Sequence, residues 1–226
     1  QMADFTFYGG LYRGVRLLLL PPVHFETSFY GASGLAVTCE TSFEAPLEAS
    51  VKAPGRAGLQ NTPDGQKGTG IPQGSAMLHL NSWVTDPSED YTVRYLILDR
   101  EGNAVSEIFR PSLAPKADVL LPDAHLWQGV EDPYLYRCIA SLVYRNETVD
   151  QVETAFGIRS FYVDPEKGFF LNGKPMMLRG VARHQDRLYQ GWALTRKEHY
   201  EDAALIKEIG ANTVRLAHYQ HSQDFY

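Results

Sequence analysis

Hydrophobic positions follow two different patterns along the chain, and the change between them separates a β-rich portion from a shorter α/β portion. From residue 23 to about residue 163, short apolar runs alternate with polar positions, as in half-buried strands. Such runs predict strands at residues 23–27, 35–41, 77–84, 91–98, 119–121, 135–144 and 149–156. About seven short strands over roughly 130 residues, with no strong helix signal, predict an immunoglobulin-like β-sandwich.

The C-terminal portion changes to a strand, helix and strand pattern. An apolar run at residues 176–181 predicts the first strand, and the β-branched segment at 213–217 predicts the second. Between them, Thr195 and Glu198 have the spacing of a capping box, which predicts a helix of roughly fourteen residues that ends at Gly210. Helical spacing places Leu205, Ile206 and Ile209 on one apolar face of this helix.

A strand, a crossover helix and a second strand form a βαβ unit, whose two strands are parallel. Polar and titratable residues follow both strands and therefore lie at the same edge of the sheet, where α/β barrels carry their sites. Those after the first strand are Arg183, His184 and Asp186, and those after the second are His218, Tyr219 and His221.

The chain begins with a different signal. Residues 4–20 read as two strands joined at Gly9 and Gly10, and a lone hairpin of this kind is marginally stable in water. A segment rich in glycine and proline at residues 53–74 predicts a mobile loop, with a tolerated insertion or a ligand-binding arm as its two interpretations.

Composition narrows the classes of function. A net charge of −6 without a basic run argues against nucleic acid, and no apolar segment reaches the length of a membrane span, so a soluble protein is expected. Cys39 and Cys138 lie in separate predicted strands, and buried free thiols are favoured over a disulfide.

Several sequence motifs, in their order and spacing, resemble glycoside hydrolase family 2, and within it the bacterial β-galactosidases. The motifs occupy residues 4–13, 126–136, 168–175, 178–181, 183–186, 205–215 and 218–221. The resemblance implies a mainly β chain in three parts. Residues 1–22 would be the last hairpin of a jelly-roll sugar-binding domain, residues 23–163 the immunoglobulin-like sandwich, and residues 164–226 the truncated first βαβ portion of a (β/α)8 TIM barrel.

The same resemblance implies that the complete protein is a retaining β-galactosidase acting on terminal β-D-galactosides, from the bacterial cytoplasm or periplasm. Two alternatives stay open. One is a β-glucuronidase or another hydrolase of the family, and the other is a non-catalytic sandwich that spaces domains or binds a partner. A homo-oligomer is also an open alternative.

The resemblance further implies that Asp4 and His218 bind sugar hydroxyls, while both catalytic carboxylates lie beyond Tyr226. For His184, Asp186 and His221, substrate binding and a buried polar network are both open, and Glu131 and Asp132 are interpreted as turn residues. No transition metal is expected, because the histidine spacing does not fit a zinc site. Magnesium and sodium in the complete protein are implied by the resemblance, and Asp4 is the one weak sodium candidate of this chain.

Overall fold

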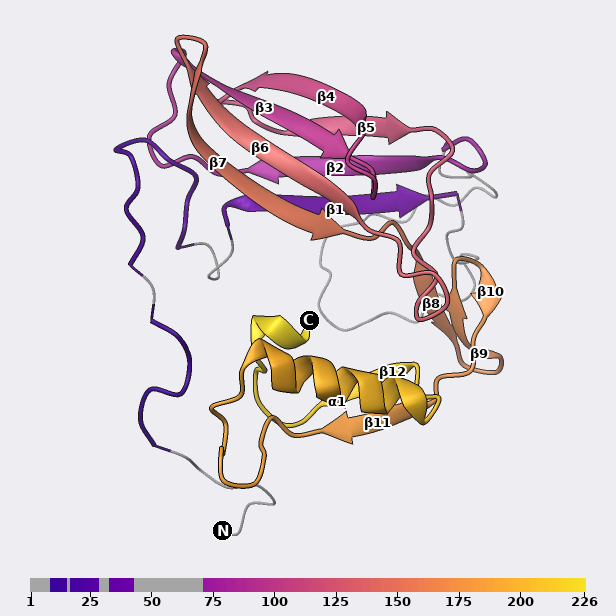
Figure 1. The fold of residues 1–226 in the computed structure, drawn as a ribbon. Coiled ribbons are helices and arrows are strands. Elements are labelled where there is room, and N and C mark those ends of the chain that lie inside the picture. Colours follow the sequence, from indigo (N-terminus) through magenta and orange to yellow (C-terminus); the bar gives the residue numbers. More distant parts are fainter. Residues whose placement is uncertain (1–8, 16, 29–32, 43–70) are drawn as a thin grey trace. The chain divides into compact units, whose positions relative to one another are not determined.

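The computed structural model describes residues 9–15, 17–28, 33–42 and 71–226 (Figure 1). The chain divides into two compact units, one of Leu19–Met176 and one that combines Gln1–Leu18 with Met177–Tyr226. Within the described residues, no helix is long and apolar enough to cross a membrane.

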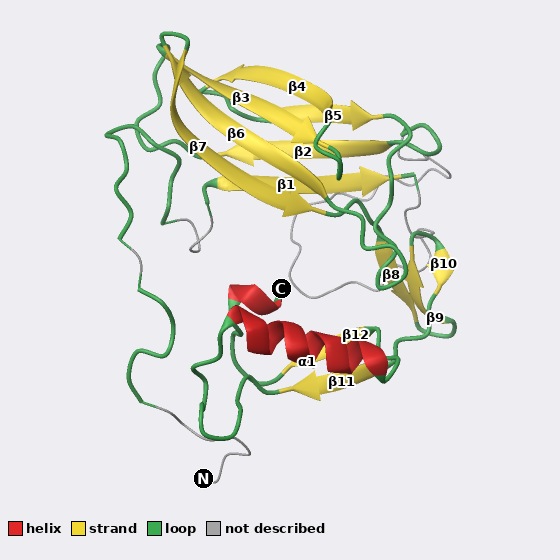
Figure 2. Cartoon of the chain, viewed as in Figure 1, coloured by secondary structure: helices red, strands yellow, loops and turns green. Residues whose placement is uncertain are grey.

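The larger unit is a sandwich of two antiparallel sheets, drawn as yellow arrows in Figure 2. One sheet has the strand order β1-β2-β5 and the other has the order β4-β3-β6-β7. The strands of the first sheet are β1 (Leu35–Thr41), β2 (Ala76–Ser82) and β5 (Ala117–Leu121). Those of the second are β3 (Tyr91–Leu98), β4 (Ala104–Pro111), β6 (Tyr136–Tyr144) and β7 (Glu147–Phe156). The predicted sandwich is thus confirmed.

Alternation along the strands builds the core between the two sheets. In β2, the side chains of Ala76, Leu78 and Leu80 are buried, and in β3 those of Val93, Tyr95 and Ile97 are buried. Because successive side chains of a strand point to opposite faces, each sheet turns one apolar face inward. The apolar positions that predicted these strands are therefore the positions that hold the sheets together.

One polar contact crosses this core. The Tyr95 hydroxyl lies 2.7 Å from the Ser82 hydroxyl on the opposite sheet and donates to the carbonyl of Pro115 over 2.8 Å. Burial raises the pKa of Tyr95 to about 12, so the hydroxyl stays protonated and can donate.

Two segments of the sandwich differ from the sequence prediction. Residues 23–27 form no strand: Phe25 makes only an isolated bridge to Val84, and its backbone N–H donates to the Asp150 carboxylate over 2.7 Å. Strand β4 was not predicted, because it lies at the edge of its sheet and most of its side chains are exposed. An edge strand needs no apolar alternation on its open face, so its sequence carries a weak signal.

A three-stranded antiparallel hairpin sheet follows the sandwich within the same unit. It consists of β8 (Phe161–Asp164), β9 (Gly168–Leu171) and β10 (Lys174–Pro175). Asp164 accepts hydrogen bonds from the backbone of Glu166 and Lys167, both at 2.9 Å, and these bonds lower its pKa. The compact unit ends at Met176, and the predicted domain boundaries at residues 22 and 163 stay predictions.

The smaller unit contains the predicted parallel strand pair. Strand β11 (Gly180–Arg183) pairs in parallel with β12 (Thr213–Leu216), in a register that sets Arg183 opposite Leu216. The predicted start of the first strand at residue 176 was wrong. The Asn212 side chain donates to the carbonyl of Met177 and accepts from the N–H of Arg179, and so takes the place of a strand partner before Gly180.

The crossover helix α1 (Arg196–Glu208) begins at the predicted capping box of Thr195 and Glu198. The Thr195 hydroxyl donates to the Glu198 carboxylate and lowers the pKa of Glu198 to about 2. Gly210 follows the helix with φ of 79°, the left-handed region that glycine adopts freely.

The predicted apolar face of α1 is not buried among the described residues. Leu205 is 60% exposed and Ile209 is 72% exposed, while His199 is the helix residue that is buried. The buried residue of α1 is therefore polar, and both His199 and Asp202 contact Arg183 of β11.

Residues at the start of the chain also depart from the prediction. The second arm of the predicted hairpin forms no strand at residues 9–15 and 17–20, since no described strand pairs with it, and the first arm lies outside the described residues. Most of the predicted loop at 53–74 also lies outside them. Both cysteines are free: Cys138 is buried, which raises its pKa to about 12, and Cys39 is half-buried.

Candidate functional site

The carboxyl ends of β11 and β12 bring together the two polar segments that the sequence singled out. Because the strands are parallel and Arg183 lies opposite Leu216, residues 184–186 and 217–221 leave the same edge of the pair. The polar side chains of both segments therefore line one edge, as predicted.

His184 and His218 meet at this edge. Their rings pack edge to face, with centroids 5.2 Å apart and an interplanar angle of 89°. The guanidinium of Arg215 lies 3.1 Å from Nδ1 of His218. Arginine has no acceptor, so Nδ1 accepts this bond and a proton lies on Nε2. His218 is exposed and presents an imidazole in a fixed orientation.

Behind this edge lies a buried network centred on Arg183, which is 6% exposed. Its guanidinium pairs with the Asp202 carboxylate, donates to Nδ1 of His199 at 3.0 Å and to Nδ1 of His221 at 3.1 Å, and stacks over the Phe225 ring at 4.0 Å. One side chain thus connects β11 with α1 and with the segment after β12.

The electrostatics of the network follow from this arrangement. Burial, assisted by the charge of Arg183, lowers the pKa of His199 and of His221. Burial opposes ionisation of Asp202, but hydrogen bonds from Arg187 and Arg183 outweigh it and lower the Asp202 pKa. At neutral pH the network therefore contains charged Arg183 and Asp202 together with two neutral imidazoles.

A second set of contacts fixes the segment after β12. The Gln185 side chain accepts from the backbone of Ser222 at 2.6 Å, while its backbone N–H donates to the Tyr219 hydroxyl at 2.9 Å. The Tyr219 ring packs on Trp192 with centroids 4.7 Å apart. Gln185 is buried, so it acts as a bridge between the two segments.

The start of the chain also reaches this edge. Tyr12 packs edge to face on Trp192 with centroids 5.2 Å apart, and Arg13 donates to the carbonyl of Gln220. Residues 9–15 therefore lie beside the predicted site within the same compact unit. Asp4, the predicted sugar ligand of this segment, lies outside the described residues.

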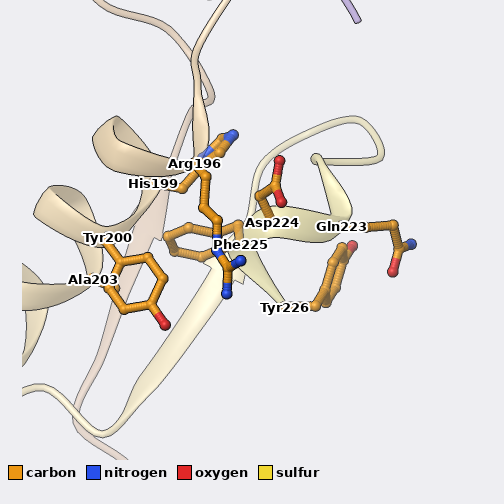
Figure 3. Close-up of a pocket in the computed structure, with 8 residues that line it drawn as sticks. All are labelled: Arg196, His199, Tyr200, Ala203, Gln223, Asp224, Phe225 and Tyr226. Atoms are coloured by element: carbon orange, nitrogen blue, oxygen red, sulfur yellow. The ribbon is translucent and has the colours of Figure 1, made fainter. Parts of the chain in front are cut away.

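A hollow of about 420 Å³ opens between α1 and the short 3-10 helix η2 (Gln223–Phe225), and His199 and Phe225 of the buried network line it. Figure 3 shows Arg196, His199, Tyr200 and Ala203 from α1 facing the segment that carries Gln223, Asp224, Phe225 and Tyr226. Nε2 of His199 is buried and makes no hydrogen bond within the described residues.

The predicted site residues separate by exposure. His218 is exposed and His184 and Asp186 are half-buried at the edge, whereas His221 is 1% exposed and engages both nitrogens, Nε2 facing the carbonyl of Ala217 at 3.3 Å. The sequence left both substrate binding and a buried polar network open for His221, and the structure shows that His221 belongs to such a network. The sugar-binding roles of these four residues stay predictions.

Three residues that contact the site were not predicted from the sequence. His199 and Asp202 lie three residues apart on α1 and both contact Arg183, and Trp192 contacts Tyr219. A histidine and an aspartate on one face of a helix were an available signal. Trp192 lies in a loop and had no comparable signal.

One of the two carboxylates interpreted as turn residues has a structural partner. Asp132 pairs with His125 at 2.6 Å, while Glu131 is exposed, in keeping with turn chemistry. Within the part of the chain that the structure describes, no group of three histidine, cysteine or carboxylate side chains could hold a metal ion.

Comparison with known proteins gives one consistent result. Residues 70–159 match the family model for glycosyl hydrolases family 2, and residues 163–226 match that of the family 2 TIM barrel domain. A beta-glucuronidase of Bacteroides fragilis is 35% identical over 225 residues, which cover 100% of this chain and 29% of that protein. A beta-galactosidase of Pseudoalteromonas haloplanktis is 40% identical over 168 residues, 67% of this chain and 16% of that protein.

Solved structures agree. The crystal structure of an FMN-binding beta-glucuronidase from Facaelibacterium prausnitzii L2-6 superposes with a TM-score of 0.83 at 44% identity, covering 100% of this chain and 30% of that one. The chain thus spans less than a third of the length of these two beta-glucuronidases. Since its sandwich and its strand, helix and strand unit each match a domain of one family, the chain belongs to glycosyl hydrolase family 2.

Proposed function

We propose that the complete protein is a retaining glycosidase that removes terminal β-D-glucuronic acid residues from glycosides. The observation that carries this proposal is the similarity to beta-glucuronidases along the whole chain, at 35% and 44% identity. It covers both the sandwich and the edge at which His184 and His218 meet.

Hydrolysis of terminal β-D-galactosides is the second candidate. The beta-galactosidase of Pseudoalteromonas haloplanktis supports it with 40% identity over two thirds of the chain, and so does the motif of residues 218–221. Both candidates use the same reaction, and their sugars differ in the substituent at C5 and in the configuration of the hydroxyl at C4.

In this proposal the chain supplies substrate positioning. An imidazole can donate to or accept from a hydroxyl, so His218, oriented by Arg215, suits a polyol. His184 packs against it and limits its rotation. Asp4 would supply a carboxylate acceptor, and each such hydrogen bond is worth about 0.5 to 1.5 kcal/mol net.

The reaction itself needs two further groups. Retaining hydrolysis uses one carboxylic acid that protonates the leaving oxygen and one carboxylate that attacks the anomeric carbon, about 5 to 5.5 Å apart. We place both beyond Tyr226, and magnesium and sodium stay expectations for the complete protein. The expected substrate is a neutral or anionic β-glycoside. Nucleic acid is not an expected partner.

The chain alone is then expected to be inactive. Purified residues 1–226 should release 4-nitrophenol from 4-nitrophenyl β-glycosides no faster than buffer does. A rate above background that disappears in Asp186→Ala or Glu131→Ala would show that the catalytic carboxylates lie within this chain.

The complete protein decides between the candidates. We expect a higher kcat/KM for 4-nitrophenyl β-D-glucuronide than for the galactoside, and NMR of the first product should show the β-anomer. A clear preference for the galactoside would promote the second candidate. If the complete protein hydrolyses neither substrate and lacks the two catalytic carboxylates, a non-catalytic sandwich that spaces domains or binds a partner would be favoured.

A further inference from the structure

A short hairpin leaves the carboxyl end of β11 before the chain enters α1. The backbones of Arg187 and Gly191 exchange two hydrogen bonds, of 3.1 and 2.9 Å, and the N–H of Gln190 donates to the carbonyl of Arg187 at 3.1 Å. Residues 187–191 therefore form a closed turn, which we call the 187–191 hairpin.

The base of this hairpin is held firmly. The Arg187 guanidinium contacts the carboxylates of Glu201 and Asp202, both at 2.6 Å, and donates to the carbonyl of Glu198 at 2.9 Å. On the other strand of the hairpin, Gly191 is buried and leads into Trp192. Charge-assisted bonds at both carboxylates restrict the base more than a single neutral bond would.

The tip of the hairpin has the opposite character. Leu188 is 78% exposed and Tyr189 is 97% exposed. Tyr189 has φ of 68°, a region that bulky side chains rarely adopt. A fixed turn that holds a strained tyrosine and a leucine in solvent indicates a contact surface, because strain of this kind persists where the surrounding structure imposes it.

The hairpin belongs to the same edge as the proposed site. It begins three residues after His184 and ends beside Trp192, which packs on Tyr219 next to His218. In Figure 1 the loop between β11 and α1 extends from the carboxyl end of β11 away from α1 before it turns back. The apolar tip thus belongs to the loop that begins at the polar edge that would hold the sugar.

We propose that Leu188 and Tyr189 form the contact for the aglycone, the group on the far side of the scissile bond, and that they select apolar or aromatic aglycones. The inference rests on the proposed glycosidase function. The polar side chains at the edge suit the hydroxyls of the sugar, whereas an exposed phenol ring and an isobutyl group suit a flat apolar leaving group through stacking and area burial.

The test compares two inhibitors of the complete protein, the phenyl and the methyl 1-thio-β-glycosides of the sugar that it hydrolyses. In Tyr189→Gly, the Ki of the phenyl compound should rise about three- to tenfold, while the Ki of the methyl compound changes less than twofold. Tyr189→Phe keeps the ring and should keep both values. Since glycine adopts φ of 68° freely, Tyr189→Gly should fold as well as the wild type does.

Tyr200→Ala is the matched control, because Tyr200 is 63% exposed on α1 and faces residues 223–226 rather than the 187–191 hairpin, so it should change neither Ki. An unchanged ratio of the two Ki values in Tyr189→Gly would overturn this inference and leave the proposed function intact. Equal weakening of both compounds, or a changed oligomeric state in sedimentation, would show that the tip packs against protein and would also overturn it. A complete protein that hydrolyses no β-glycoside would overturn both.

Discussion

Arg183 donates to Nδ1 of His221 over 3.1 Å and thereby determines that the proton of this buried imidazole lies on Nε2. The same guanidinium holds Asp202 and His199, so the segment that carries His218 is tied to β11 and to α1 through one side chain. Stability and activity should therefore respond differently when this network or the exposed edge is changed.

Replacing Arg183 should destabilise the smaller unit. Arg183→Met removes a buried charge and leaves the Nδ1 atoms of His199 and His221 without their donor, which we expect to cost about 3 kcal/mol. Hydrogen exchange of residues 213–225 in the complete protein measures this loss locally. Arg94→Met breaks an exposed pair with Glu107 and is the control, expected to cost under about 1 kcal/mol. Equal effects of both variants would contradict the central role of Arg183.

Stability of this unit should fall as the pH falls below about 6.5. The pKa values of His199 and His221 are lowered in the folded state, so the unfolded state binds more protons there. The stabilisation is complete above the unfolded pKa and is lost as the pH drops from that value through the folded pKa. Hydrogen exchange of residues 196–208 at pH 7.5 and 5.5 should show it, and His199→Gln should reduce the difference. A pH-independent exchange rate would refute the assignment.

The hydroxyl of Tyr95 should stabilise the sandwich. Tyr95→Phe leaves the Ser82 hydroxyl and the Pro115 carbonyl without their buried partner, and we expect a loss of about 1 to 3 kcal/mol in the free energy of unfolding. Urea denaturation followed by tryptophan fluorescence measures it. Tyr144→Phe, which keeps its stacking on Tyr91, should lie within about 0.5 kcal/mol of wild type. An unchanged free energy of unfolding in Tyr95→Phe would mean that water replaces the hydroxyl.

His218→Ala should affect catalysis rather than folding. The side chain is exposed, so its removal leaves no cavity, but the loss of a hydrogen bond that strengthens in the transition state should lower kcat/KM by about 100-fold. Asp4→Ala should behave in the same way if its predicted role is right. His24→Ala is the control in the sandwich unit, and the melting temperatures of all variants should match that of the wild type. Unchanged kinetics would remove the positioning role.

Sequence reasoning performed well where a local signal sufficed. The strands at Leu35–Thr41 and Tyr91–Leu98 agree with the prediction residue for residue, and so does the cap at Thr195, because alternation and capping are short-range patterns. It failed where a distant partner decides the outcome. Asn212 displaces the start of β11 through side-chain bonds across more than thirty residues, and no local pattern contains that information.

The site shows the same division. The order of strand and polar segment predicted that residues 183–186 and 218–221 share an edge, because parallel pairing follows from the βαβ order. Which histidine faces solvent and which is buried depends on Arg183, whose partners come from α1 and from the segment after β12. His218 and His221 have the same residue type and neighbouring positions, so only the folded arrangement separates them.

The sandwich has a consequence for the order of events on the ribosome. Every described strand pair of its two sheets joins residues between Leu35 and Phe156, and the buried core extends only to Phe25 and Ile158. Synthesis proceeds from the N-terminus, so these partners have all emerged before β11 is made. Synthesis from the N-terminus therefore allows the slow, long-range strand pairing of the sandwich to begin first. The later strand pair, whose partners are close in sequence, can assemble after it.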